Sequence, residues 1–260
     1  EIAIDNNCID RLVTQYKPTH VFIEGLWVIP EKFDILKKLH PNVEWIVRIH
    51  SELPFLAQEG IALEWINGYL KRAISVSGNS LRINSAISNL AKVINPILSE
   101  KKTPLLPNYY PIDDVINITK KNTKNSEVHI GCFGAIRPLK NHLTQAFAAI
   151  EYAKKVNKKL YFHINSARIE SGGNNILKNI RALFNSLGNQ FQLVEHGWLS
   201  HNEFLNLIAT MDILLQVSFS ETFNIVTADA VSQAIPVVVS KEISWVQSPK
   251  SDPTSVSDIE

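Results

Sequence analysis

The hydrophobic and polar positions of this chain follow two alternating patterns along its whole length. Short apolar runs, typical of buried strands, are followed by polar loops and then by longer segments with apolar residues at helical spacing. Strands that alternate with helices predict parallel sheets covered by helices on both faces. The expected strands are 20–23, 43–49, 73–76, 103–106, 128–133, 160–164, 191–194, 213–217 and 236–239, and the expected helices are 31–39, 61–70, 80–93, 143–154, 174–187, 201–209 and 223–234.

The strands fall into two series separated by a polar stretch at 120–126, which is typical of a linker. We therefore expect an α/β fold with two Rossmann-like, doubly wound domains that face each other across a cleft. Their predicted bounds are 1–112 and 127–260, joined by a linker at 113–126. The first domain offers fewer strands than a full Rossmann-like unit, so we expect it to be incomplete. Because the only methionine is Met211, we also expect a fragment or a trimmed product.

Composition narrows the class of partner. The chain has 45% hydrophobic and 20% charged residues and a net charge of +1, which argues against nucleic acid as a partner. Cys8 and Cys132 are the only cysteines, so neither a disulfide framework nor a thiolate metal site is expected. This usage fits a reducing compartment, and we expect a cytoplasmic protein. Cys132 lies in an expected strand, where a thiol packs as a small hydrophobe.

Membrane association is open at this stage. No apolar run approaches the length of a membrane-spanning helix. Lys71 and Arg72 beside Trp65 and Tyr69 either contact an anionic surface, which allows peripheral binding to the inner face of a membrane, or form a solvated helix end.

A loop with two cations follows the first strand of the second series. Gly134 at the end of that strand permits a ligand to approach the backbone closely. Arg137 can bind a phosphate through two nitrogens, and Lys140 can act as a point charge, so the pair suits a diphosphate. The alternative is a surface loop with two ordinary cations.

An acidic loop leads into the predicted helix 223–234. The amides of Thr222, Phe223 and Asn224 are expected at the start of this helix, where the helix dipole favours an anion. Glu221 can accept hydrogen bonds from sugar hydroxyls, and Asp229 lies about two turns into the helix, within reach of a ribose. Otherwise Glu221 is an acidic capping group and Asp229 a solvated helix residue.

Two further positions are candidates for ligand contact. His50 ends an expected strand of the first domain, where a side chain points into the cleft, although single histidines are often structural. Trp198 follows the strand 191–194 and either contacts a nucleobase or packs within the protein. The sequence contains no HExxH zinc motif, no glycine-rich phosphate loop ending in Lys-Ser/Thr and no Gly-x-Ser-x-Gly nucleophile turn.

In their order and spacing, these segments resemble the retaining, nucleotide-sugar-dependent glycosyltransferases of the GT-B fold, group 1 type. Their E-x7-E motif corresponds here to Glu221-Thr222-Phe223-Asn224 through Asp229-Ala230. Further matching segments are Gly134, Arg137 and Lys140-Asn141, the strand Pro236-Val237-Val238-Val239-Ser240, Pro107-Asn108 at the start of the linker, Gly25-Leu26-Trp27, and His50. The resemblance covers most of the chain and implies a GT-B-like enzyme truncated at both ends.

The resemblance also implies roles for the residues. Arg137 and Lys140 would neutralise the donor diphosphate, and Gly134 would let the loop approach the donor or the acceptor. Glu221 would hold hydroxyls of the donor sugar, and Asp229 the ribose. The implied reaction transfers a sugar to a glycan or a lipid-linked acceptor, with retention and with no metal or other cofactor.

The remaining implied contacts involve His50, which would lie near the reacting carbon, and the amides of Phe223 and Asn224 on the sugar or phosphate. The chain departs from the family pattern at three places: Asp229 is shorter than the usual glutamate, Thr222 and Asn224 replace glycines, and Arg137 and Lys140 are closer together than in the commoner Arg-x4-Lys.

Two other functions are open for the same residues. A GT-B-fold nucleotide-sugar epimerase would need more carboxylates around the sugar. A non-catalytic nucleotide-binding module, whose site has drifted, would agree with Asp229 and the missing glycines. The truncation expected at both ends would make even a true transferase inactive as this fragment.

Overall fold

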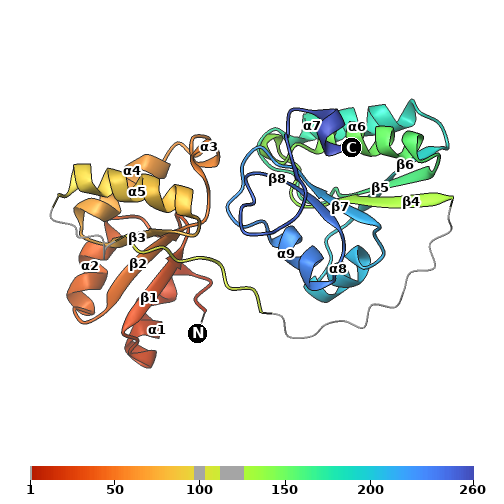
Figure 1. Ribbon diagram of the computed structural model, residues 1–260. Coiled ribbons are helices and arrows are strands. Elements are labelled where there is room, and N and C mark those ends of the chain that lie inside the picture. Colours follow the sequence, from red (N-terminus) through yellow and green to blue (C-terminus); the bar gives the residue numbers. More distant parts are fainter. Residues whose placement is uncertain (1, 97–102, 112–125) are drawn as a thin grey trace. The chain divides into compact units, whose positions relative to one another are not determined.

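The computed structural model describes residues 2–96, 103–111 and 126–260 and contains two compact units, Glu1–Tyr109 (unit 1) and Tyr110–Glu260 (unit 2) (Figure 1). Each unit is an α/β structure with a parallel sheet, which confirms the predicted fold class. The predicted linker, 113–126, lies outside the described residues except for Ser126. Its bounds stay a prediction.

Unit 1 contains a parallel sheet of three strands in the order β1-β2-β3. The register pairs Ile23 of β1 with Val47 of β2, and Val47 with Val76 of β3. The strands are β1 (His20–Glu24), β2 (Glu44–Ile49) and β3 (Ser75–Gly78), and the helices are α1 (Ile9–Tyr16), α2 (Lys32–Leu39), α3 (Leu53–Leu56), α4 (Ala62–Lys71) and α5 (Leu81–Ile94).

The core of unit 1 forms where the helices pack on this sheet. Phe33 of α2 is fully buried and makes edge-to-face contacts with Trp45 and with Tyr69, whose ring centroids lie 5.8 and 5.6 Å away. Such aromatic pairs stabilise a core beyond the area they bury. The helix α1 was not predicted, although its apolar residues Ile9 and Val13 are buried in the same core.

The predicted strand 103–106 is wrong as a full strand. Only Leu105 forms an isolated bridge, to Gly78 at the end of β3, and the Leu106 N–H donates to the Gly78 carbonyl at 3.0 Å. Pro104 and Pro107 lack the N–H donors that a longer ladder requires.

Unit 2 contains a parallel sheet of six strands in the order β6-β5-β4-β7-β8-β9. Numbered along unit 2, this is the order 3-2-1-4-5-6 of a doubly wound nucleotide-binding fold. The strands are β4 (Glu127–Cys132), β5 (Lys159–Asn165), β6 (Phe191–His196), β7 (Ile213–Gln216), β8 (Val237–Ser240) and β9 (Lys250–Ser251). The short, polar β9 carries no apolar pattern and was not predicted.

Helices cover both faces of this sheet (Figure 1). The helices α6 (His142–Lys155) and α7 (Gly173–Asn185) pack on one face, and α8 (His201–Ile208) and α9 (Ile225–Ser232) pack on the other. The short helix α10 (Val256–Ile259) adds Ile259 to the α6 side. Cys132 is buried in the same cluster, as predicted, and burial raises the pKa of its thiol to about 12.

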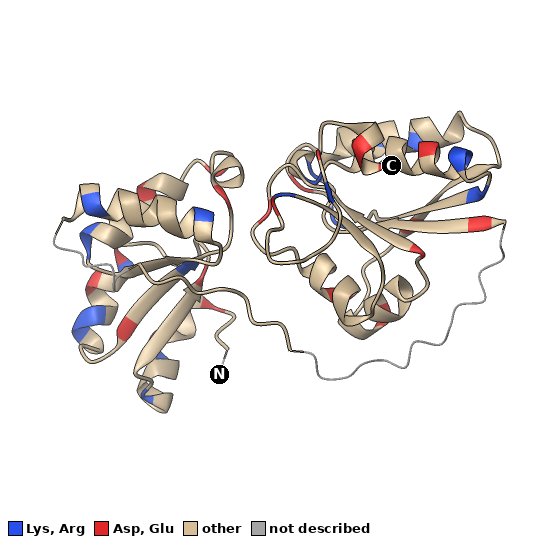
Figure 2. Cartoon of the chain, in the orientation of Figure 1, with Lys and Arg blue, Asp and Glu red and all other residues tan. Residues whose placement is uncertain are grey.

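The surface carries charges of both signs on both units, interspersed along the helices and loops (Figure 2). Around Trp65, the structure favours a helix end over a membrane-contact surface, and peripheral membrane contact stays a prediction. Tyr69 is fully buried, and Arg72 pairs with Asp34 at 3.1 Å instead of standing free. Among the helices described, none has both the length and the apolar character needed to span a bilayer.

Candidate functional site

The candidate site lies at the point where the sheet of unit 2 changes its winding direction. The neighbouring strands β4 and β7 pair at Ile130–Ile213 and Gly131–Leu214, and their following helices, α6 and α9, lie on opposite faces. A crevice opens beyond the carboxyl ends of two strands at such a point. Residues 133–141 after β4 form the first loop, and residues 217–224 after β7 form the second loop.

Buried side-chain amides hold the two loops together. Asn141 Nδ2 donates to the Val217 carbonyl at 3.1 Å, and Gln145 Oε1 accepts from the Val217 N–H at 2.8 Å. Gln145 also donates to the Lys140 carbonyl at 2.8 Å. Buried amides with satisfied hydrogen bonds fix the geometry of neighbouring segments, so the first and second loops form one rigid rim.

Lys140 and Glu221 form an ion pair across this rim. Their side chains are only 13% and 8% exposed. Lys140, which was predicted to bind the diphosphate, and Glu221, which was predicted to bind the sugar, therefore bind each other in the structure. Because removing one partner of a buried pair leaves an uncompensated charge, each residue depends on the other.

Gly134 lies beside this pair and has a φ of +117°, which other residues rarely adopt. A β-carbon on Gly134 would lie 3.8 Å from Lys140 Cε. The Gly134 N–H donates to Asn165 Oδ1 at 3.2 Å, which connects the first loop to the end of β5. The predicted close approach of backbone and ligand is sterically possible at this position.

Helix α9 begins at Ile225, two residues later than predicted. Asn224 has a φ of +61°, which interrupts the helix, and its Oδ1 accepts from the Thr227 N–H at 2.9 Å. Thr222, Phe223 and Asn224 therefore lie in the second loop, and their amides are not those of the first helical turn as predicted.

Asp229 lies on α9 and is only 2% exposed, so the interpretation as a solvated helix residue is wrong. Its Oδ1 accepts from Tyr110 Oη at 2.7 Å and from His201 Nε2 at 2.8 Å. Burial raises the pKa of Tyr110, and the hydrogen bond to Asp229 raises it further. Tyr110 is thus a neutral donor to the carboxylate.

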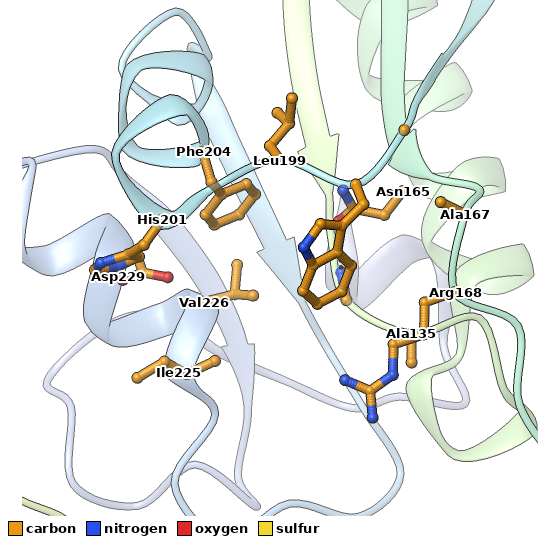
Figure 3. A pocket seen from close by; sticks show the side chains of 13 residues that line it. Ala135, Asn165, Ala167, Arg168, Leu199, His201, Phe204, Ile225, Val226 and Asp229 are labelled. Carbon is orange, nitrogen blue, oxygen red and sulfur yellow. Dashed lines mark hydrogen bonds and ion pairs between the residues drawn. The ribbon is translucent and has the colours of Figure 1, made fainter.

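A pocket of about 280 Å³ opens between the first loop, the ends of β5 and β6, and the helices α8 and α9 (Figure 3). Of the predicted site residues, Gly134, Trp198 and Asp229 line it. Trp198 is 76% exposed, so it is not a packing residue of the core. The lining residues that the sequence did not indicate are Ala135, Asn165, Ala167, Arg168, Gly197, Leu199, His201, Phe204, Ile225 and Val226.

Arg137 does not line this pocket. Its Nη1 contacts Glu170 Oε2 at 3.1 Å, and its side chain is 20% exposed. The cation that does line the pocket is Arg168, from the loop after β5. A role of Arg137 at a diphosphate stays a prediction.

Two histidine arrangements lie close to the site. His142 at the start of α6 is fully buried, and neither ring nitrogen has a hydrogen-bond partner within the described residues. Burial, with the charges of Lys140 and Arg137, lowers the pKa of His142 to about 3. His163 connects His129 and His196 through two hydrogen bonds of 2.9 Å, and burial lowers the pKa of His196.

His50 lies in unit 1, directly after β2, where the sequence predicted it. It is exposed and packs over Gly25, where a β-carbon would lie 2.8 Å from His50 Cε1. Gly25 also has a positive φ of +70°, so this position favours glycine twice over. Contact of His50 with a donor sugar stays a prediction.

The part of the chain that the structure describes contains no group of three or more His, Cys, Asp or Glu side chains arranged to hold a metal ion. Three cationic side chains, those of Lys140, Arg137 and Arg168, lie on the loops after β4 and β5.

No protein-family model matches the chain, and no curated protein matches its sequence. Its fold matches solved structures. An apo structure of OtsA is 9% identical with a TM-score of 0.72, and the match covers 98% of this chain and 66% of that one. A UDP-forming α,α-trehalose-phosphate synthase from Burkholderia xenovorans is 10% identical with a TM-score of 0.74, over 98% and 67% of the two chains.

A third structure, described as trehalose-6-phosphate from E. coli bound with UDP-2-fluoro glucose, is 9% identical with a TM-score of 0.74, over 96% and 66% of the two chains. This chain spans about two thirds of the length of these proteins. At such low identity the similarity concerns the fold. The chain therefore has the parallel α/β architecture of the GT-B fold that its sequence predicted.

Proposed function

We propose that this chain binds a nucleoside diphosphate sugar and transfers the sugar to a glycan or lipid-linked acceptor, with retention and without a metal ion. The observation that carries the proposal is the pocket of unit 2, which opens where its doubly wound sheet changes direction. Asp229 lines this pocket, and the pair of Lys140 and Glu221 lies beside Gly134 at its rim.

The pocket combines apolar walls with a few polar groups, as small-ligand sites commonly do. Phe204, Ile225 and Val226 offer apolar surface to a base and its ribose. Asp229 is held by two donors on one oxygen, Oδ1, and we assign its second oxygen to a ribose hydroxyl. An aspartate, although shorter than the glutamate usual in the family motif, suits this arrangement because its carboxylate lies within the pocket wall.

In this proposal Lys140 and Glu221 have different roles near the bond that breaks between the sugar and the diphosphate. Departure of the diphosphate develops negative charge, and the ammonium group of Lys140 stabilises it in a site that excludes most water. Glu221 accepts hydrogen bonds from hydroxyls of the donor sugar. In the ligand-free structure each neutralises the other, so the donor must share Lys140 with Glu221.

The similar solved structures support the donor class. One is described as UDP-forming, another as bound with UDP-2-fluoro glucose, and a third as a complex with glucose-6-phosphate. We therefore take uridine nucleotides as the first donors to test and include a sugar phosphate among the acceptors.

The test combines binding and turnover on the whole chain. Calorimetric titration with UDP, GDP and ADP is followed by incubation with the matching nucleotide-glucose and a panel of acceptors, with and without EDTA. We expect binding of at least one diphosphate, followed by acceptor-dependent release of that diphosphate that EDTA does not abolish. No binding of any of the three would contradict the proposal.

A nucleotide-binding module without transferase activity is the second candidate. The specific observation that favours it is that Glu221 and Lys140 already bind each other, which leaves neither charge uncompensated in the absence of ligand. Binding of a diphosphate without turnover of any nucleotide sugar would favour this candidate over the transferase.

A further inference from the structure

The side chain that brings positive charge into the pocket of unit 2 is Arg168. Among the described residues that line the pocket, it is the only lysine or arginine, and its side chain is 60% exposed. Figure 3 shows its guanidinium group turned into the pocket on the side of Ala135. Arg137, which the sequence motif indicated, lies outside the pocket lining and is 20% exposed.

Both arginines bind one carboxylate, that of Glu170. Arg168 Nε contacts Glu170 Oε1 at 2.6 Å, and Arg137 Nη1 contacts Glu170 Oε2 at 3.1 Å. Two guanidinium groups share one carboxylate, so Glu170 alone does not compensate both positive charges. The more exposed of the two arginines, Arg168, is the one that lines the pocket.

The backbone around Glu170 is firmly held against the first loop. The Glu170 N–H donates to the Ile136 carbonyl at 3.0 Å, and the Ile136 N–H donates to the Arg168 carbonyl at 2.9 Å. Gly173 packs so closely that a β-carbon there would lie 2.0 Å from the Ile136 oxygen. This close contact fixes the loop that carries Arg168 to the loop that carries Gly134.

This geometry leaves the two terminal nitrogens of the Arg168 guanidinium group accessible to a ligand. Its Nε is occupied by Glu170, and within the described residues its two terminal nitrogens have no hydrogen-bond partner. A guanidinium group can bind two phosphate oxygens through its parallel N–H groups. Glu170 removes the side-chain freedom that such a contact would otherwise cost.

We propose that Arg168, positioned by Glu170, binds a phosphate group of the nucleoside diphosphate in the pocket of unit 2, and that Arg137 contributes by holding Glu170. This inference deepens the proposed function and rests on it. Arg168 and Lys140 then supply charge to the diphosphate from two loops, those after β5 and β4.

The test measures affinity for UDP, GDP, ADP and the corresponding nucleosides in the wild-type chain and in Arg168→Gln. For the diphosphate that binds, we expect a loss of roughly ten- to hundredfold in Arg168→Gln, the range for a lost charge-assisted hydrogen bond. Affinity for the matching nucleoside should change by less than about twofold, because the nucleoside has no phosphate.

Two further variants separate the residues of the cluster. Arg181→Gln is the matched control, because Arg181 also makes a two-point contact with a glutamate, Glu195, at 2.7 and 2.8 Å, but outside the pocket lining. It should leave diphosphate affinity unchanged. Arg137→Gln should weaken diphosphate binding less than Arg168→Gln does. The melting temperature of each variant shows whether the fold is retained.

The outcomes distinguish this inference from the proposed function. Wild-type binding with Arg168→Gln unchanged would overturn the inference and leave the proposed function standing. Equal losses for diphosphate and nucleoside, or a larger loss in Arg137→Gln than in Arg168→Gln, would overturn it as well. No binding by the wild-type chain would overturn both.

Discussion

Glu221 and Asp229 are both buried and lie eight positions apart, yet the protein holds their side chains in different ways. Glu221 is 9% exposed and binds the ammonium group of Lys140, which comes from another loop. Asp229 is 2% exposed and accepts hydrogen bonds from Tyr110 and His201. One carboxylate is thus balanced by a charge, and the other is held by hydrogen-bond donors. This difference predicts how substitutions near Glu221 and near Asp229, and changes in pH, affect stability and binding.

Removal of Lys140 should have the largest effect. In Lys140→Ala, Glu221 stays buried without its cation, and we expect the free energy of unfolding to fall by about 3 kcal/mol. Urea denaturation measures the loss. The double variant Lys140→Met with Glu221→Gln, which removes both charges, should recover most of this stability but no nucleotide binding. A loss below about 0.5 kcal/mol in Lys140→Ala would mean that the pair is not a buried one.

Acid should lower the free energy of unfolding through His142, which is buried near Lys140 and Arg137. Its pKa is lowered to about 3 in the folded protein, against about 6.5 in an unfolded chain. Between these values the unfolded state binds the extra proton, so stability is complete above about pH 6.5 and falls as the pH decreases toward 3. The loss should reach about 2 kcal/mol at pH 5, at roughly 1.4 kcal/mol for each pH unit.

Urea denaturation at several pH values measures this slope, and His142→Leu serves as the control. The variant should lose the part of the slope that His142 contributes and keep the part from other groups, among them His196, whose pKa is also lowered. An identical slope in the variant and the wild type would show that His142 is not the group responsible.

Changes at Asp229 should affect binding more than stability. Asp229→Asn keeps an oxygen that accepts from Tyr110, so we expect a loss of only about 1 kcal/mol in unfolding free energy. Affinity for the bound nucleotide should fall roughly tenfold if Asp229 accepts from the ribose. Tyr110→Phe is the paired variant and should cost a similar amount of stability with a smaller effect on affinity. Unchanged affinity in Asp229→Asn would remove Asp229 from the site.

At Asn224, which lies between the two carboxylates in the sequence, we expect an effect on stability alone. Asn224→Gly keeps the backbone φ of +61° but loses the cap on Thr227 and the 3.0 Å bond to Gln216, so we expect a loss of about 1 kcal/mol. Asn224→Ala should lose more, because alanine disfavours the positive φ. Thermal unfolding of the two variants gives the comparison, and a more stable alanine variant would contradict it.

The alternation of apolar strands and amphipathic helices was enough to predict a doubly wound parallel sheet with loops at the ends of its strands. The apolar runs at 128–133 and 236–239 identify buried parallel strands directly, and Gly134 and Glu221 lie in loops that follow strands, as predicted. These features depend on local pattern and on fixed rules of topology.

The features that the sequence did not predict depend on tertiary contacts and on single backbone angles. Tyr110 lies 119 positions from Asp229 in the sequence, and no local sequence pattern predicts their contact. Arg168 follows β5 without any motif, so its place at the pocket depends on the strand order β5-β4. The start of α9 moved to Ile225 because Asn224 adopts a positive φ that sequence periodicity does not reveal.

The most direct test of the central claim is a crystal structure of the chain with the nucleoside diphosphate that binds it. We predict that the ribose lies against Asp229 in the pocket of unit 2, and that the diphosphate lies between Arg168 in the pocket and Lys140 at its rim. A nucleotide bound elsewhere on the protein, or a pocket left empty at saturating nucleotide, would contradict the account.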